Sequence, residues 1–180
     1  SYTVAVLLEE ILLKKIPVVV IDPHGEYSTL KYPNPKDKEA MISFNLEPKG
    51  FLNQVIEYSP DIDTNKEAKP LKLSNKNLSS GELIQLLPTK LSSAQLGLMY
   101  TAIKNLGGKV DFGELLFELE TIEDNNSKWT LINIIEYLKK LNLFSNNPTL
   151  MGELVQPGKM SIINLKGVSP DVQGIVAYKL

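Results

Sequence analysis

The spacing of apolar residues near the start of the chain changes from a helical period to one short continuous run. Over residues 1–15, apolar side chains recur at the spacing of a single helical stripe, and glutamate and lysine fall mostly on the other side. Residues 16–21 (IPVVVI) are uncharged and rich in β-branched side chains, which predicts a strand buried on both faces. Pro23 and Gly25 then predict that the strand ends in a turn. The predicted stripe consists of Val4, Leu7, Leu8, Ile11 and Leu12.

Further along the chain, short apolar runs alternate with polar segments and predict more strands. Residues 28–50 are polar and rich in proline and lysine, which is typical of a surface connection. Residues 54–59 and 160–165 have the apolar character of strands, and the alternation at 71–73 favours a short edge strand. Serine, proline and aspartate at 169–171 mark the start of a last helix, which we expect to continue to the end of the sequence.

Residues 79–144 keep a helical period, which predicts about four helices with no strand between them. Serine or aspartate precedes each predicted helix, and three of these residues are followed three positions later by glutamate or glutamine, the pattern of a capping box. A helical block between two strand-forming segments indicates an α/β layered domain with a helical insertion. The predicted helix starts are Ser79 with Glu82, Ser92 with Gln95, Asp111 with Glu114, and Ser127.

Composition narrows the classes of function without selecting one. The net charge of −2, with no polybasic run, provides no electrostatic signature of nucleic-acid binding. The chain has no cysteine, which excludes disulfides and thiolate metal sites and is compatible with an intracellular location. No apolar run reaches the roughly 18 residues of a membrane span. All 19 basic residues are lysine, so an arginine finger would have to come from outside these 180 residues.

The turn after the first strand carries the strongest candidate chemistry. Asp22, His24 and Glu26 follow the predicted strand within five residues. Ligands of open α/β sheets bind at the carboxyl ends of the strands, so this pattern suggests a site for a metal-bound, phosphate-bearing ligand. An alternative interpretation is a solvated turn that Asp22 holds through an Asx-type hydrogen bond.

Three stretches of the sequence resemble the archaeal HerA family of DNA-translocating ATPases, within the HerA/FtsK group of RecA-like P-loop motors. They are residues 1–10 (SYTVAVLLEE), residues 16–27 (IPVVVIDPHGEY) and residues 147–165. The resemblance implies an α/β fold, namely a partial RecA-like P-loop NTPase domain with a largely parallel sheet and an inserted block of about four helices. It divides the chain into a first part of the ATPase core at 1–78, a helical insertion at 79–146 and a return to the core at 147–180.

The resemblance also implies roles for individual residues and the cofactors ATP and Mg²⁺. Ser1 matches the last residue of the family's phosphate-binding loop, where the hydroxyl binds Mg²⁺; the alternative is an ordinary helix-capping serine. We expect the glycines and lysine of that loop, the family's later acidic motif and its arginine finger to lie outside these residues, which alone should be inactive. Within the sequence, the implied nucleotide-binding residues are Ser1, Tyr2 and Thr3, the metal-binding residues are Ser1 and Asp22, and the catalytic residues are Asp22, Glu26 and His24.

The function implied by the resemblance is that of an ATP-dependent double-stranded DNA translocase or helicase. In the family, a hexameric ring works with a NurA-type nuclease in DNA end resection, inside the cell and without a membrane. Two alternatives stay open on the sequence. The chain could be a catalytically inert helical interaction module, or it could belong to a conjugation or secretion ATPase of the same group.

Overall fold

The computed structural model describes residues 2–34, 36, 38–45 and 47–180. Contacts between residues divide the chain into two compact units. Unit 1 comprises Ser1–Leu71 and Thr149–Val168, and unit 2 comprises Lys72–Pro148 and Ser169–Leu180. The predicted division into core, insertion and returning core remains a prediction.

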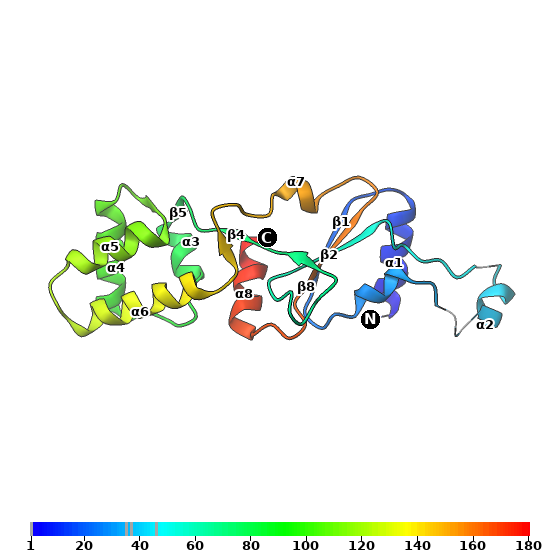
Figure 1. The fold of residues 1–180 in the computed structure, drawn as a ribbon, viewed down its shortest axis with the longest axis horizontal. Coiled ribbons are helices and arrows are strands. Elements are labelled where there is room, and N and C mark those ends of the chain that lie inside the picture. The colour runs from blue at the N-terminus through cyan, green and yellow to red at the C-terminus, as the bar shows by residue number, and fades with distance from the viewer. Residues whose placement is uncertain (1, 35, 37, 46) are drawn as a thin grey trace. The chain divides into compact units, whose positions relative to one another are not determined.

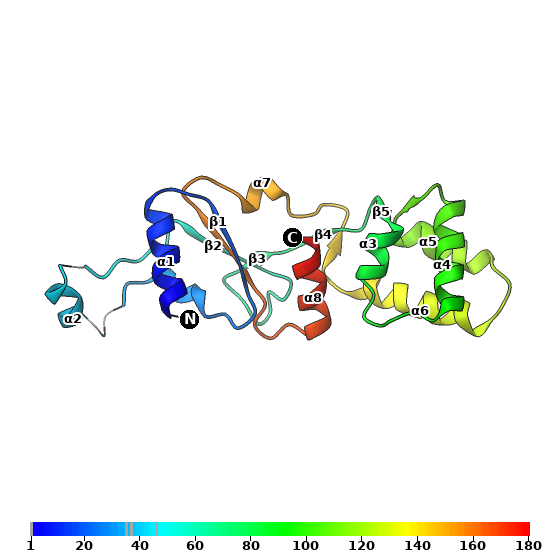
Figure 2. The same cartoon turned by 180° about the vertical axis from the view of Figure 1, so that it is seen from behind.

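Unit 1 is built around a four-stranded parallel sheet (Figures 1 and 2). The strands lie in the order β1-β8-β2-β3, and all three neighbouring pairs are parallel. This confirms the prediction of an α/β fold with a largely parallel sheet. The elements of unit 1 are α1 (Tyr2–Leu13), β1 (Val18–Asp22), the 3-10 helix η1 (Tyr27–Lys31), α2 (Lys38–Ser43), β2 (Val55–Ser59), β3 (Lys69–Pro70), α7 (Met151–Leu154) and β8 (Met160–Asn164).

One face of this sheet packs against α1 and η1. Leu8 and Leu12 of α1 are buried together with Leu30 of η1 and with alternate residues of the strands, such as Val55 and Ile162. Because side chains alternate along a strand, the residues two positions further on point to this same face. At the carboxyl edge those residues are polar, and they form the site described below.

The predicted environments of α1 and β1 are only partly correct. Strand β1 lies at the end of the four-stranded order, and the prediction that it is buried on both faces was wrong. Val19 and Ile21, which point away from α1, are each 39% exposed. Two members of the predicted α1 stripe, Val4 and Leu7, are also exposed, whereas Leu8 and Leu12 are buried.

Two connections contain more structure than the sequence predicted. Residues 28–50, predicted as a surface connection, include most of η1 and all of α2. Residues 71–73, predicted as one edge strand, do not form a single strand: β3 ends before them, at Pro70, and β4 (Leu73–Ser74) begins at their last residue, in a different sheet.

Unit 2 contains the predicted helical block, and its local start signals are mostly confirmed. The capping boxes that begin at Ser79, Ser92 and Asp111 are all formed. The fourth helix is capped by Asn125, whose side chain accepts the N–H of Lys128, so the prediction of Ser127 was wrong by two residues. The helices are α3 (Ser80–Gln85), α4 (Ser93–Asn105), α5 (Phe112–Thr121), α6 (Asn126–Lys140) and α8 (Pro170–Lys179).

The prediction that no strand interrupts this block was wrong. Strand β5 (Leu78–Ser79) pairs antiparallel with β6 (Lys109–Val110), which lies between α4 and α5. Strand β4 pairs in parallel with β7 (Phe144–Ser145). These two-residue strands carry too little periodicity to be recognised from the sequence. In the part of the chain that the structure describes, no helix is long and apolar enough to cross a membrane.

Glu82 of α3 should make unit 2 sensitive to acid. Its carboxylate accepts the N–H and hydroxyl of Ser79 at 3.0 and 2.8 Å and lies 2.8 Å from Lys179 Nζ. The Lys179 hydrogen bond and then those from Ser79 lower the pKa of Glu82 from 4.5 to about 2. A lowered pKa stabilises the fold above pH 4.5, and this stabilisation is lost as the pH falls from 4.5 toward 2.

We therefore expect Glu82→Gln to lower the free energy of unfolding by about 1 kcal/mol at pH 7, since the pair is partly exposed, and by less at pH 3. Glu136→Gln is the matched control, because Glu136 pairs with Lys140 on the exposed side of α6. Urea unfolding at both pH values measures the difference. An equal loss at pH 7 and pH 3 would contradict the assigned role of the charge.

Candidate active site at the carboxyl edge of the sheet

The carboxyl ends of β1, β8 and β2 bring three buried polar side chains onto one face of the sheet. Asp22 lies opposite Asn164 in the β1–β8 register, and Glu57 lies opposite Ile162 in the β8–β2 register. All three are at least nine-tenths buried, with Asp22 only 1% exposed. The face that packs against α1 thus becomes polar at the edge where parallel sheets bind ligands.

Asp22 holds the turn that follows β1. Its Oδ1 accepts the N–H of Gly25 at 2.9 Å and of His24 at 3.3 Å, and its Oδ2 accepts the N–H of Tyr27 at 2.9 Å. The Asx-type hydrogen bonding considered for this turn is therefore present. A carboxylate that accepts several backbone N–H groups fixes the positions of the residues between them, here His24 and Glu26.

Gly25 is required by the shape of this turn. It has a φ of +70°, in the left-handed region that favours glycine. A side chain at this position would also come within 3.3 Å of Asn164 Oδ1 and 3.1 Å of Lys166 Cδ. The backbone of the turn thus lies directly on Asn164 and on the stem of Lys166.

Glu57 and Lys31 form a buried ion pair beneath the turn. Lys31 Nζ lies 2.5 Å from Glu57 Oε1 and 3.1 Å from Glu67 Oε2. Burial raises the pKa of Glu57, but hydrogen bonds from Lys31, Asn164 and Ser28 outweigh it, so the pKa lies below its usual value. Burial likewise lowers the pKa of Lys31, and the hydrogen bonds to Glu57 and Glu67 outweigh it and raise the pKa. Both groups are therefore charged at neutral pH.

The other residues predicted for the site are more exposed. His24 and Glu26 lie on the solvent side of the turn, and Tyr2 and Thr3 are exposed at the start of α1. Ser1, predicted to bind the nucleotide and the metal, lies outside the described residues. Tyr27 is partly buried against the core of unit 1.

The described residues do not by themselves fit a metal ion. Among them, no three of the histidine, aspartate and glutamate residues gather in a metal-binding group. Both carboxylate oxygens of Asp22 already accept backbone N–H groups. Mg²⁺ usually binds through one or two carboxylates together with substrate phosphates, so a site here would depend on groups beyond this cluster.

The sequence did not identify Glu57 and Lys31, and it assigned no role to Asn164. One usable signal was present, because Glu57 is the one charged residue of a predicted strand segment (QVIEYS). A charge at a buried strand position needs a partner, and such pairs are frequent at functional sites. The identity of that partner, Lys31, depends on tertiary structure.

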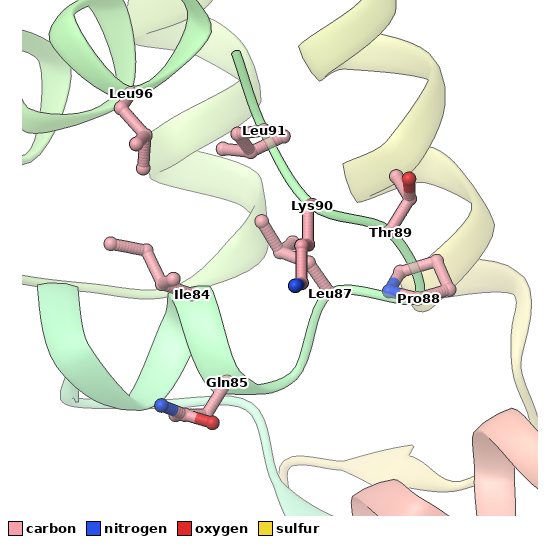
Figure 3. A pocket seen from close by; sticks show the side chains of 8 residues that line it. All are labelled: Ile84, Gln85, Leu87, Pro88, Thr89, Lys90, Leu91 and Leu96. Carbon is pink, nitrogen blue, oxygen red and sulfur yellow. The ribbon is translucent and has the colours of Figure 1, made fainter. Parts of the chain in front are cut away.

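Unit 2 contains a pocket of a different kind (Figure 3). It has a volume of about 500 Å³ and lies between α3, the loop that follows it and the first turn of α4. Only one of its lining residues, Lys90, is ionisable, so it offers little for acid–base or phosphoryl-transfer chemistry. The lining residues are Ile84, Gln85, Leu87, Pro88, Thr89, Lys90, Leu91 and Leu96.

Comparison with known proteins gives one clear result. The model of the family described as "Helicase HerA, central domain" matches residues 1–180, which is the whole chain. None of the curated proteins compared with the chain matches it.

Proposed function

Since the chain belongs to the HerA helicase family, whose central-domain model covers all of it, we propose that it works as part of an ATP-driven motor acting on double-stranded DNA. The observation that carries this proposal is the combination of that match with the polar cluster at the carboxyl edge of the parallel sheet. In open α/β sheets, this is the edge at which nucleotides bind.

We propose that the chain contributes to the motor in the three segments that the sequence predicts. Residues 1–78 and 147–180 would supply parts of the ATPase core, and residues 79–146 would form a helical insertion. Phosphoryl transfer depends mainly on positioning and on stabilising charge, so a rigid turn bearing charged groups suits it. The proposed cofactors are ATP and Mg²⁺.

The proposed roles of single residues centre on the turn after β1. Asp22 would serve hydrolysis from the strand end, and it would also keep His24 and Glu26 in place. Those two exposed side chains would face the nucleotide phosphates and the attacking water. At the start of α1, Ser1, Tyr2 and Thr3 would contact the nucleotide, with the Ser1 hydroxyl on its metal ion.

The proposed partners are linear duplex DNA, further copies of the same protein in a hexameric ring, and a NurA-type nuclease. Together they would resect DNA ends inside the cell. The absence of arginine from the chain is consistent with a shared active site, since an arginine finger must then come from elsewhere in the protein or from a neighbouring subunit.

Displacement of a third DNA strand tests the function directly. The assay uses the longest natural protein that contains this chain, with a DNA triplex carried on a linear duplex. ATP-dependent release of the third strand is the expected result, because a translocating motor removes what lies in its path. Hydrolysis that neither responds to duplex DNA nor releases the strand would favour a conjugation or secretion ATPase. No hydrolysis at all would favour the inert interaction module.

A further inference from the structure

Three charged or polar side chains lie buried beneath the Asp22 turn. Lys31, Glu57 and Asn164 are 7%, 6% and 5% exposed, and they come from η1, β2 and β8 respectively. Burial of such groups costs free energy unless each of them is paired. An apolar core could close this end of the sheet without them, so their contacts indicate what else they do.

Asn164 is the centre of these contacts. Its Nδ2 donates to Glu57 Oε2 at 3.0 Å and to Ser28 Oγ at 3.5 Å. Its Oδ1 accepts the backbone N–H of Lys166 at 3.1 Å. Ser28 directly follows the turn, so one side chain connects the turn, strand β2 and the segment after β8.

The turn lies directly on this network. A Cβ on Gly25 would lie 3.3 Å from Asn164 Oδ1, which is closer than an ordinary contact, so Asn164 would have to shift by a few tenths of an ångström. Gly25 also donates its N–H to Asp22 Oδ1. A change in the position of Asn164 is therefore transmitted to the backbone N–H groups that hold the Asp22 carboxylate.

The ion pair fixes the other end of the network. Lys31 binds Glu57 Oε1, which leaves Oε2 to accept from Asn164. Lys31 ends η1, the short helix that begins at Tyr27, the last residue held by Asp22. The chain that leaves the turn is thus held at Ser28 by Asn164 and at Lys31 by Glu57, and both contacts converge on Glu57.

We propose that Asn164 and Glu57 are positioning residues, which hold the Asp22–Tyr27 turn in the geometry needed for ATP hydrolysis. Asn164 lies against Gly25 of the turn, and Glu57 acts through Asn164 and Lys31; neither residue is assigned a contact with the substrate. This inference rests on the proposed ATPase function and adds two residues to it.

Asn164→Asp in the longest natural protein that contains this chain tests the proposal. The new carboxylate cannot donate to Glu57 and repels it. We expect kcat for ATP to fall by about 10–100-fold with little change in KM, because misplaced active-site groups slow the reaction more than they weaken binding. Hydrogen exchange at the amides of Gly25 and Tyr27 should become faster.

The double variant Glu57→Gln with Asn164→Asp exchanges donor and acceptor between the two positions and keeps one negative charge within the network. It should recover most of the lost kcat, which a merely destabilising change would not do. Ser161→Ala is the matched control, since Ser161 is buried near the other end of β8 and donates to the carbonyl of Leu154 at 2.7 Å. It should alter neither kcat nor exchange at Gly25 and Tyr27.

The outcomes separate this inference from the function on which it rests. If Asp22→Asn is inactive while Asn164→Asp keeps kcat within about twofold of the parent, the positioning role is wrong and the ATPase function stands. If Asp22→Asn remains active, the proposed function of the turn fails. If Asn164→Asp does not fold, Asn164→Ala replaces it, and a kcat no lower than that of Ser161→Ala overturns the inference.

Discussion

Replacement of Lys31 by methionine is expected to lower the free energy of unfolding by about 3–5 kcal/mol, because it leaves the buried carboxylate of Glu57 without its cation. Methionine has a volume similar to that of lysine, so the substitution leaves little cavity. The loss of unfolding free energy therefore comes mainly from the unpaired charge of Glu57. Glu57 would keep its hydrogen bonds from Asn164 and Ser28. These two neutral donors do not replace an ammonium group 2.5 Å away.

Two further variants make this measurement specific. Lys31→Met combined with Glu57→Gln removes the unpaired charge and should recover much of the stability. Lys140→Met breaks an exposed pair with Glu136 and should change stability by less than about 0.5 kcal/mol. Urea unfolding at pH 7 measures the free energy of unfolding of the parent and of these three variants. A loss below about 1 kcal/mol for Lys31→Met would contradict the account of the pair.

The pair also predicts how stability depends on pH. Glu57 has a lowered pKa, so its contribution is present above its unfolded pKa of about 4.5 and is lost as the pH falls through the folded value. Lys31 has a raised pKa, so its contribution is present below its unfolded pKa of about 10.5 and is lost at higher pH. The difference between parent and Lys31→Met should therefore be largest between these two values and shrink in acid.

Asp22→Asn is expected to reduce ATP turnover by about 10²–10⁴-fold while leaving nucleotide binding largely intact. The substitution removes the negative charge at the strand end. It also replaces one acceptor by a donor, so an N–H of the turn, from Gly25 or Tyr27, loses its partner. Turnover and nucleotide affinity are measured on the longest natural protein that contains this chain.

Asp61→Asn is the matched control for this variant. Asp61 lies two residues beyond the end of β2, whereas Asp22 is the last residue of β1. The Oδ1 of Asp61 accepts the N–H groups of Asp63 and Thr64 at 3.1 Å. The control thus loosens a turn of the same kind at the same edge of the sheet. It should retain turnover. An equal loss in both variants would show that general loosening of this edge, and not Asp22, causes the effect.

The parts of the fold that depend on local sequence could be predicted. The capping box at Ser79 was found because its two partners lie three residues apart and bind each other, whatever surrounds them. Strand β8 followed from the short apolar run at residues 160–165. The start of α6 was missed because Asn125 and Ser127 are both good capping residues, and only the packing of the helix selects between them.

The parts of the fold that depend on contacts between distant residues could not be predicted from the sequence. The apolar sequence of β1 is the same whether the strand lies in the middle or at the end of a sheet, so its exposure at Val19 was not predictable. The turn at Asp22 was recognised from its own residues. Its support by Lys31 and Glu57 comes from elements about 10 and 35 residues away along the chain, and no local pattern links them.

The rate of ATP hydrolysis, with and without linear duplex DNA, is the most direct test of the central claim that this chain is part of a DNA-driven motor. It is measured on the longest natural protein that contains the chain. We predict hydrolysis that duplex DNA stimulates and that Asp22→Asn reduces by about 10²–10⁴-fold. A folded protein whose hydrolysis is absent, or is unchanged by both duplex DNA and Asp22→Asn, would contradict the claim.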